Sequence, residues 1–152
     1  RGRSKQMKEG MGIVDPNNAV VGIITEVTDD YAVVMSMLHK DSHISGKLLK
    51  GGETGTLTWD GKEPNLVTLT NIPKSARIAK GDSIITSGFS TTFPKGMLIG
   101  RVEGVYTESS SNYDKVNFHT AANFYNLQYV YAIYNEHQEP VNKIIDKLNK
   151  QH

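Results

Sequence analysis

Short runs of β-branched and apolar residues, separated by turn-forming residues, fill most of this 152-residue chain. Residues 20–27 (VVGIITEV) and 31–38 (YAVVMSML) flank a pair of aspartates and predict a hairpin. This pattern predicts antiparallel sheet, and the regular spacing of the runs favours a barrel or sandwich over βαβ units. Further strand candidates are residues 54–59, 65–70, 83–87, 97–106, 113–119 and 127–134.

Glycines indicate where these strands turn and bend. Asp60-Gly61 lies between two strand candidates, and type I′ turns favour this pair because both central residues need positive φ. In residues 97–105, Gly100 and Gly104 alternate with large side chains on one face, which indicates a bend or the close approach of another backbone. The sheet is therefore expected to be strongly curved.

A change of period near the C-terminus predicts one short helix. Pro140 suits the first position of a helix, and four apolar residues follow it at i, i+3, i+4 and i+7 spacing. These four residues are Val141, Ile144, Ile145 and Leu148. We expect a helix or tail over residues 139–152.

Composition excludes several classes of protein. A net charge of +1 disfavours nucleic-acid binding, and zero Cys excludes disulfide scaffolds, thiolate metal sites and a Cys nucleophile. The longest apolar stretch, residues 19–24, is far shorter than the roughly 18 residues that span a bilayer. Because the chain opens at Arg1 without a signal-like segment, we expect a soluble fragment of a longer protein.

Candidate catalytic and metal-binding groups are weak. His39, Asp41 and His43 would share one face of an extended strand, but a solvated turn explains them better, so no metal is expected. Ser87 and Ser90 lack the Gly-x-Ser-x-Gly context of a hydrolase nucleophile. The Gly-rich residues 51–55 lack the Lys-Ser/Thr ending of a phosphate loop. We therefore predict no catalytic residues and no cofactor.

Three segments together resemble a known family. Residues 20–38 resemble a G-x-V-x-x-V hairpin, residues 79–88 (AKGDSIITSG) resemble G-D-x-V-x-T-S-G, and residues 93–102 (FPKGMLIGRV) resemble F-P-x-G-I-x-I-G-x-V. These patterns are similar to the extracytoplasmic β region of the bacterial rod-shape-determining MreC family, from about Met11 to Tyr134. The signature positions are Gly81, Asp82, Thr86, Ser87, Gly88, Phe93, Pro94, Gly96 and Gly100.

The resemblance implies an all-β fold of two small antiparallel β-barrels, distantly chymotrypsin-like but without an active site. Residues 1–42 alone supply too few strands to close a barrel, so we expect residues 113–135 to return and complete the first, which is incomplete at its N-terminus. Residues 43–112 would form the second barrel. Phe93 and Pro94 are expected to plug the end of the second barrel.

The resemblance also implies a function. It suggests a non-enzymatic scaffold of the cell-elongation machinery that maintains cell shape by organising or activating peptidoglycan synthesis. The implied partners are a class B penicillin-binding transpeptidase, MreD, the MreB filament and a second copy of the chain. The parent would be a single-pass protein at the periplasmic face of the bacterial inner membrane, its membrane segment absent from this chain. The alternative is a protease-like or ligand-binding β-barrel.

Aromatic residues supply the candidate partner-binding surface. Tyr129 and Tyr131 share one face of the last strand candidate, and Tyr134 follows on the other face. Phe89 lies in the Gly- and Pro-containing loop of residues 88–96, which we call the signature loop. Because aromatic side chains concentrate at binding hot spots, we predict that these four residues contact partners.

Overall fold

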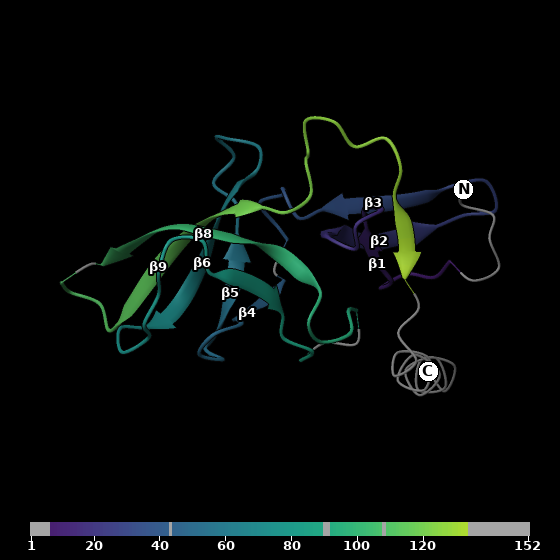
Figure 1. Cartoon of the computed structure of the whole chain (residues 1–152). Helices are drawn as coiled ribbons and strands as arrows, with labels where there is room; N and C mark the ends of the chain where they lie inside the picture. Colours follow the sequence, from purple (N-terminus) through teal and green to yellow (C-terminus); the bar gives the residue numbers. More distant parts are fainter. Residues whose placement is uncertain (1–6, 43, 90–91, 108, 134–152) are drawn as a thin grey trace, which may run out of the picture.

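Ten β-strands make up the described part of the chain in the computed structural model, which covers residues 7–42, 44–89, 92–107 and 109–133. No helix occurs among these residues. The strands are β1 (Gly12–Val14), β2 (Val20–Val27), β3 (Ala32–Ser36), β4 (Ser45–Leu48), β5 (Thr54–Thr58), β6 (Leu66–Pro73), β7 (Ser83–Thr86), β8 (Leu98–Thr107), β9 (Tyr113–Thr120) and β10 (Tyr131–Ile133). They form a closed barrel and a separate sheet (Figure 1).

The closed barrel has the strand order β4-β5-β6-β9-β8-β7, with β4 also paired to β7. Alternate residues of each strand point inward, and apolar side chains such as Leu69, Val116 and Phe118 are fully buried there. Gly46 leaves room for this packing, because a Cβ at that position would lie 2.7 Å from Leu57 Cδ1. The barrel therefore has a filled interior rather than a lumen.

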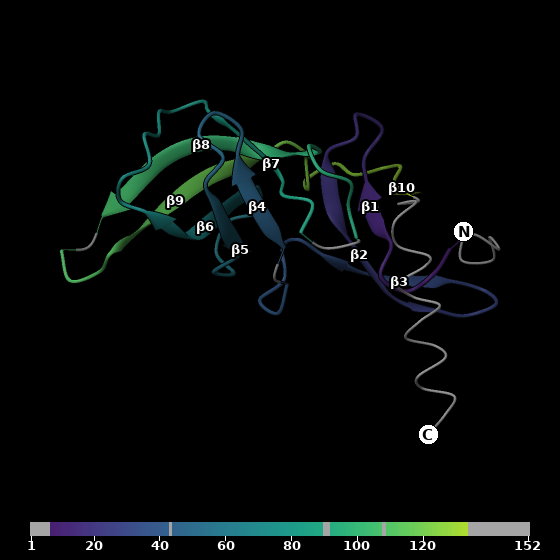
Figure 2. The ribbon, with the colours of Figure 1, turned by 90° about the horizontal axis from the view of Figure 1, so that it is seen from below.

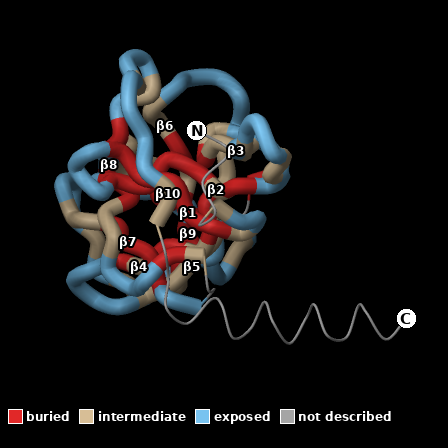
Figure 3. The backbone as a smooth tube through the Cα atoms, turned by 90° about the vertical axis from the view of Figure 1, so that its right-hand side faces the viewer, coloured by how far each residue is buried: buried red, intermediate tan, exposed pale blue. Residues whose placement is uncertain are grey.

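The second module is a four-stranded antiparallel sheet, which we call the sheet module, of order β10-β1-β2-β3. Figure 2 shows it beside the barrel, with β10 and β1 together. One core cluster joins the two modules, since Val14 and Val20 pack in the same cluster as the barrel interior. A smaller cluster, with Ile13 and Ile24 at its centre, covers the other side of the sheet module. Buried positions gather in the interior, and most exposed ones lie in the surrounding loops (Figure 3).

The expected hairpin of residues 20–27 and 31–38 is confirmed, because β2 and β3 pair antiparallel. The Asp60-Gly61 prediction is right that the chain reverses between two paired strands, and wrong about the type of turn that connects them. Strands β5 and β6 do pair, but seven residues, 59–65, connect them. Gly61 has φ 85°, whereas the non-glycine residues with positive φ in the described chain are Asn18, Asn65 and Asn71. Asp60 therefore does not adopt the type I′ conformation.

Strand β9 corrects the expected division of the chain. Residues 113–135 were expected to return to the first module, but β9 lies between β6 and β8 in the closed barrel. Its ladders with both neighbours run almost its whole length, and without it the barrel would have two open edges. Only the later part of that segment returns, because β10 pairs with β1.

Two other expectations differ from what is seen. The sheet module has end strands β10 and β3, so closure into a second barrel is not observed among the described residues. The expected helix over residues 139–152 lies outside the described residues.

The expected close approach at Gly100 is confirmed. A Cβ there would overlap the His119 carbonyl oxygen and lie 2.6 Å from Phe118 Cδ2. Gly104 differs, because a Cβ at that position would meet nothing within 4 Å. The register shifts between Val102 and Gly104, so the bulge carries the bend there.

Candidate functional site

The signature loop joins β7 to β8, and the Thr86 side chain bonds with two of its backbone groups. The hydroxyl of Thr86, which is buried, donates a hydrogen bond to the Pro94 carbonyl oxygen at 2.6 Å and accepts one from the Met97 amide at 2.9 Å. The Thr86 backbone pairs with the same segment, accepting from the Gly96 amide at 3.0 Å. Thr86 therefore fixes both ends of the Phe-Pro-x-Gly segment.

Phe93 points from this loop into the junction between the modules. It is 3% exposed and belongs to the core cluster that contains both Val14 of β1 and barrel residues. Gly12 of β1 lies directly against the ring: a Cβ there would be 2.6 Å from Cδ1 and 2.9 Å from Cζ. The prediction that Phe93 and Pro94 plug the end of the barrel is wrong for Pro94, which is exposed. Phe93 is buried, and its ring packs on the sheet module as well as on barrel residues.

The other signature residues shape the backbone around Phe93. Gly81 has φ 92° and Gly96 has φ 94°, conformations that L side chains rarely adopt. The Asp82 carboxylate accepts a hydrogen bond from the Ala79 amide at 2.9 Å and closes the turn before β7. Gly88 also has positive φ, and a Cβ on it would lie 2.9 Å from Lys95 Cβ.

Ser87 lies between β7 and the signature loop and forms hydrogen bonds in both directions. Its hydroxyl bonds with that of Ser45 in β4 at 2.9 Å and accepts a bond from the Phe89 amide at 3.2 Å. Ser90, the other serine considered, lies outside the described residues. Ser87 therefore links the signature loop to β4 of the barrel and holds the backbone amide of Phe89.

Three aromatic side chains that the sequence singled out are exposed, and we call Phe89, Tyr129 and Tyr131 the aromatic surface. Their exposed fractions are 77%, 69% and 56%. Tyr134 lies outside the described residues. Tyr131 pairs in register with Val14, so it shares the sheet face of Gly12 and Val14, against which the Phe93 loop packs. Strand β1 is therefore the element that both the loop and β10 contact.

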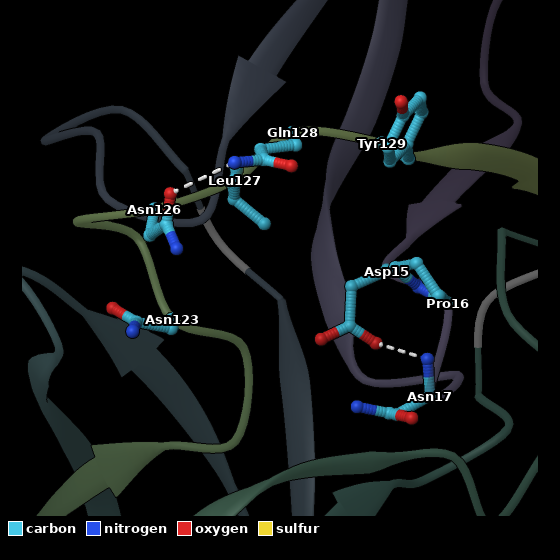
Figure 4. A pocket seen from close by; sticks show the side chains of 8 residues that line it. All are labelled: Asp15, Pro16, Asn17, Asn123, Asn126, Leu127, Gln128 and Tyr129. Atoms are coloured by element: carbon cyan, nitrogen blue, oxygen red, sulfur yellow. Dashed lines mark hydrogen bonds between the residues drawn. The ribbon is translucent and has the colours of Figure 1, made fainter.

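Tyr129 also lines a pocket of about 300 Å³ between the β1–β2 turn and the segment that leads into β10. The remaining lining residues are Asp15, Pro16, Asn17, Asn123, Asn126, Leu127 and Gln128. Figure 4 shows Tyr129 opposite Asp15 and Pro16, with the amides of Asn123 and Asn126 to one side. One oxygen of the Asp15 carboxylate accepts from the Asn17 and Ala19 amides at 2.8 and 2.9 Å. That oxygen closes the β1–β2 turn. The side-chain amides and the Tyr129 side chain supply most of the remaining lining of the pocket.

Asn65 is a positioning residue that the sequence reading missed. Its side-chain oxygen accepts hydrogen bonds from the Phe124 amide at 2.8 Å and from the Thr120 hydroxyl at 3.2 Å. These bonds tie the segment after β9 to the β5–β6 loop. The signal in the sequence was weak, an Asn after Pro64, and the structure shows that Asn65 takes φ 70°.

Two lysines form a local positive charge beside the signature loop. The pKa of Lys47, in β4, is lowered by a hydrogen bond with Lys95 and by repulsion from its charge, with a smaller contribution from desolvation. Lys95 belongs to the signature loop, and its Cβ lies 2.9 Å from the position that a Cβ on Gly88 would take. The loop surface near Phe89 is therefore positively charged although the chain as a whole is nearly neutral.

The groups considered for chemistry are placed as follows. His39 Nδ1 lies 4.0 Å from an Asp41 carboxylate oxygen, both exposed, and His43 lies outside the described residues. Over the described ranges, no three His, Asp or Glu side chains form a metal-binding group. His119 pairs with Glu103 at 2.8 Å on the barrel surface, while Ser87 bonds with Ser45.

The fold defines this protein as an all-β barrel domain with a packed interior. Exposed aromatic residues lie on its surface. A family model described as "Rod shape-determining protein MreC, barrel core" matches residues 1–134. The chain therefore belongs to the MreC family.

Relatives and solved structures agree with this assignment. The chain is 26% identical over 133 residues to the cell shape-determining protein MreC of Listeria monocytogenes, covering 86% of this chain and 45% of that protein. A solved MreC structure from Listeria monocytogenes is similar with a TM-score of 0.80 and 24% identity, covering 89% of this chain and 65% of that one. A complex of penicillin-binding protein PBP2 and MreC from Helicobacter pylori contains a chain with TM-score 0.69 and 19% identity, covering 88% and 83%.

This chain spans less than half the length of the curated Listeria relative. Among the residues that the structure describes, no helix is long and apolar enough to cross a membrane.

Proposed function

We propose that this chain is a non-enzymatic scaffold domain of the cell-elongation machinery and acts by binding other proteins. Its membership of a shape-determining family supports a role in cell shape. The Helicobacter pylori neighbour, a complex of MreC with PBP2, supports a penicillin-binding transpeptidase as the partner. In this proposal the chain organises or activates peptidoglycan synthesis through the contacts that it makes.

The observation that carries the proposal is the position of Tyr131. It lies on β10, an end strand of the sheet module, and more than half of its side chain is exposed. An end strand offers backbone N–H and C=O groups for strand addition, and an aromatic side chain beside them supplies an anchor. Strand β10 therefore combines both requirements of a β-augmentation site.

The same surface serves self-association in this proposal. A second copy of the chain presents the same strand edge, and antiparallel pairing of two such edges is compatible with a two-fold axis. We further propose a location at the periplasmic face of the inner membrane and assembly with MreD and the MreB filament. Similar solved domains described as the major periplasmic domain of MreC support that location.

We also propose that the sheet module is the described part of a second small barrel, distantly like those of chymotrypsin-type proteases. Its end strands are β10 and β3, and the edge of β10 is the one proposed above for partners. A longer chain of the same protein should then show an additional strand paired to β3.

The test is the affinity of the chain for the extracytoplasmic domain of a class B transpeptidase, measured by interferometry. We expect Phe89→Ala, Tyr129→Ala and Tyr131→Ala each to weaken binding while the melting temperature stays near that of the wild type. Tyr31→Ala is the matched control, because Tyr31 is 55% exposed on the β2–β3 turn, away from β10. If all three folded variants bind as tightly as the control, the aromatic surface is not the contact.

A further inference from the structure

The pocket of about 300 Å³ between the β1–β2 turn and the segment before β10 has a polar lining that carries little charge. Of the residues that line it, four carry carboxamides, and only Asp15 is charged at neutral pH. The volume corresponds to about ten water molecules at roughly 30 Å³ each, which is room for one sugar-sized ring. Size and polarity therefore favour a small polar ligand.

One carboxylate oxygen of Asp15 is available to a ligand in this pocket. Its Oδ1 accepts the Asn17 and Ala19 amides, and its Oδ2 makes no hydrogen bond or ion pair within the described residues. Asp15 is only 7% exposed, yet Oδ2 is not one of the buried side-chain atoms that lack a partner, so this oxygen is open to solvent. Figure 4 shows it directed away from the turn, towards the side where Asn123 and Asn126 lie. The pocket therefore contains an accessible acceptor that the chain itself does not use.

The side-chain amides on that side of the pocket offer donors. Asn123 Oδ1 accepts from the Tyr125 amide at 3.0 Å, and Asn126 Oδ1 accepts from Gln128 Nε2 at 3.5 Å. The side-chain nitrogens of Asn123 and Asn126 have no acceptor in the part of the chain that the structure describes. A ligand that satisfies the pocket must therefore donate a hydrogen bond to Asp15 and accept hydrogen bonds from the amides.

A sugar ring meets these requirements. Each hydroxyl group both donates and accepts, whereas a cation only donates and would leave the amide nitrogens without acceptors. Tyr129, which is 69% exposed, lies across the pocket from Asp15 and Pro16 and offers an aromatic surface to the C–H groups of such a ring (Figure 4).

We propose that this pocket binds one neutral hexopyranose ring. Asp15 accepts a hydrogen bond from one hydroxyl, and Asn123 and Asn126 donate to others. Tyr129 also belongs to the aromatic surface, but the proposal goes beyond the function proposed for that surface and does not rest on it.

The probes are the methyl glycosides of glucose, galactose and N-acetylglucosamine, each titrated into the isotope-labelled full chain and followed by amide NMR. For at least one of them we expect saturable shifts centred on Asn17, Asn126 and Tyr129. The affinity is expected to be millimolar, because the hydrogen bonds of a single ring replace bonds to water. Ethylguanidinium, a cation that only donates, and N-acetylglycinamide, a peptide-like amide, should each bind severalfold more weakly.

Asp15→Asn separates sugar binding from folding. An Asn at this position keeps the oxygen that accepts the two amides of the turn and replaces Oδ2 with a donor. The variant should stay folded and weaken binding of the glycoside about tenfold, because hydrogen bonds to charged groups are among the stronger ones. Asp60→Asn, at an exposed aspartate on the β5–β6 loop, is the matched control and should bind as the wild type does.

Three results would overturn the proposal: no localised saturable shift with any of the three glycosides, tighter binding of ethylguanidinium or N-acetylglycinamide, or unchanged affinity in Asp15→Asn. If Asp15→Asn does not fold, Asn126→Ala replaces it, because Asn126 is exposed. That variant should weaken glycoside binding severalfold, and unchanged affinity in the folded variant counts against the site. The titration contains no transpeptidase, so its failure is distinguishable from a failure of the proposed scaffold function.

Discussion

Replacing Phe93 with Ala should remove the main contact between the signature loop and the two modules. The ring is 3% exposed, and it packs both against barrel residues and on Gly12 of β1. Truncating a buried Phe to Ala costs about 3–5 kcal/mol, because transfer free energy is lost and a cavity remains. For a domain of this size, that corresponds to a fall in melting temperature of roughly 6–20 °C.

A substitution at Gly12 tests the same contact from the side of β1. In the wild type, a Cβ at position 12 would overlap the Phe93 ring, so Gly12→Ala should destabilise the protein. With Ala at position 93 the ring is gone, and Gly12→Ala should cost much less. We expect a coupling free energy of about 1–3 kcal/mol between the two substitutions, whereas distant sites are nearly additive.

The assay is urea unfolding of the wild type, both single variants and the double variant, followed by circular dichroism. Gly104→Ala is the matched control, because Gly104 also lies in a strand but a Cβ there meets nothing within 4 Å. The reasoning is refuted if Phe93→Ala changes stability by less than about 1 kcal/mol, well below the usual core range. It is also refuted if Gly12→Ala is as harmless as Gly104→Ala.

Four further predictions concern the barrel and the partner surface. Thr86→Val should cost about 1–3 kcal/mol in urea unfolding, because it leaves the Pro94 carbonyl and the Met97 amide without their shared hydroxyl; Thr25→Val, which is exposed, should be close to neutral. Gly100→Ala should destabilise by about 1–3 kcal/mol in the same assay because of the His119 carbonyl, and equal stability of Gly100→Ala and Gly104→Ala would contradict the close approach. Asp114→Leu should leave the melting temperature equal or higher, since it removes a buried oxygen that has no partner, and a large fall would show that the carboxylate stabilises the fold. Binding to the transpeptidase should weaken only modestly up to about 1 M salt, where the Debye length is about 3 Å, because a net charge of +1 gives little long-range attraction and Lys47 and Lys95 near Phe89 make only part of the contact salt-sensitive; a steep loss of affinity would indicate a mainly electrostatic contact.

Local features of the fold could be predicted from the sequence, because they depend on short-range periodicity. Alternation in residues 20–27 and 31–38 identified the β2–β3 hairpin, and the Gly100 position indicated the close approach that the structure has. The turn at Asp60-Gly61 was misjudged, because residues 59–65 form a longer loop in which Asn65 takes positive φ. Alternation identifies a strand but says little about the length of the connection after it.

Strand pairing over long distances could not be predicted in the same way. Strand β9 has the same alternation whether it joins the barrel or the sheet module, and its place is set by pairing with β6, about 50 residues earlier. The contact between Phe93 and Gly12 is likewise non-local, so the sequence indicated that Phe93 is buried but not that its ring packs on the sheet module. The bulge in β6 lies between Leu69 and Ile72, and Asn71 takes positive φ there, which the alternation of the strand does not indicate.

Site-specific photo-cross-linking tests the proposed scaffold function most directly. A photoreactive phenylalanine analogue placed at position 131, 129 or 89 of the chain is irradiated with a class B transpeptidase, and the covalent products are mapped by mass spectrometry. The proposal predicts cross-links to the transpeptidase from positions 131, 129 and 89, and none when the same analogue replaces Tyr31 as the control. Cross-links from position 31 alone, or none from any position in a sample in which the two proteins bind, would contradict it.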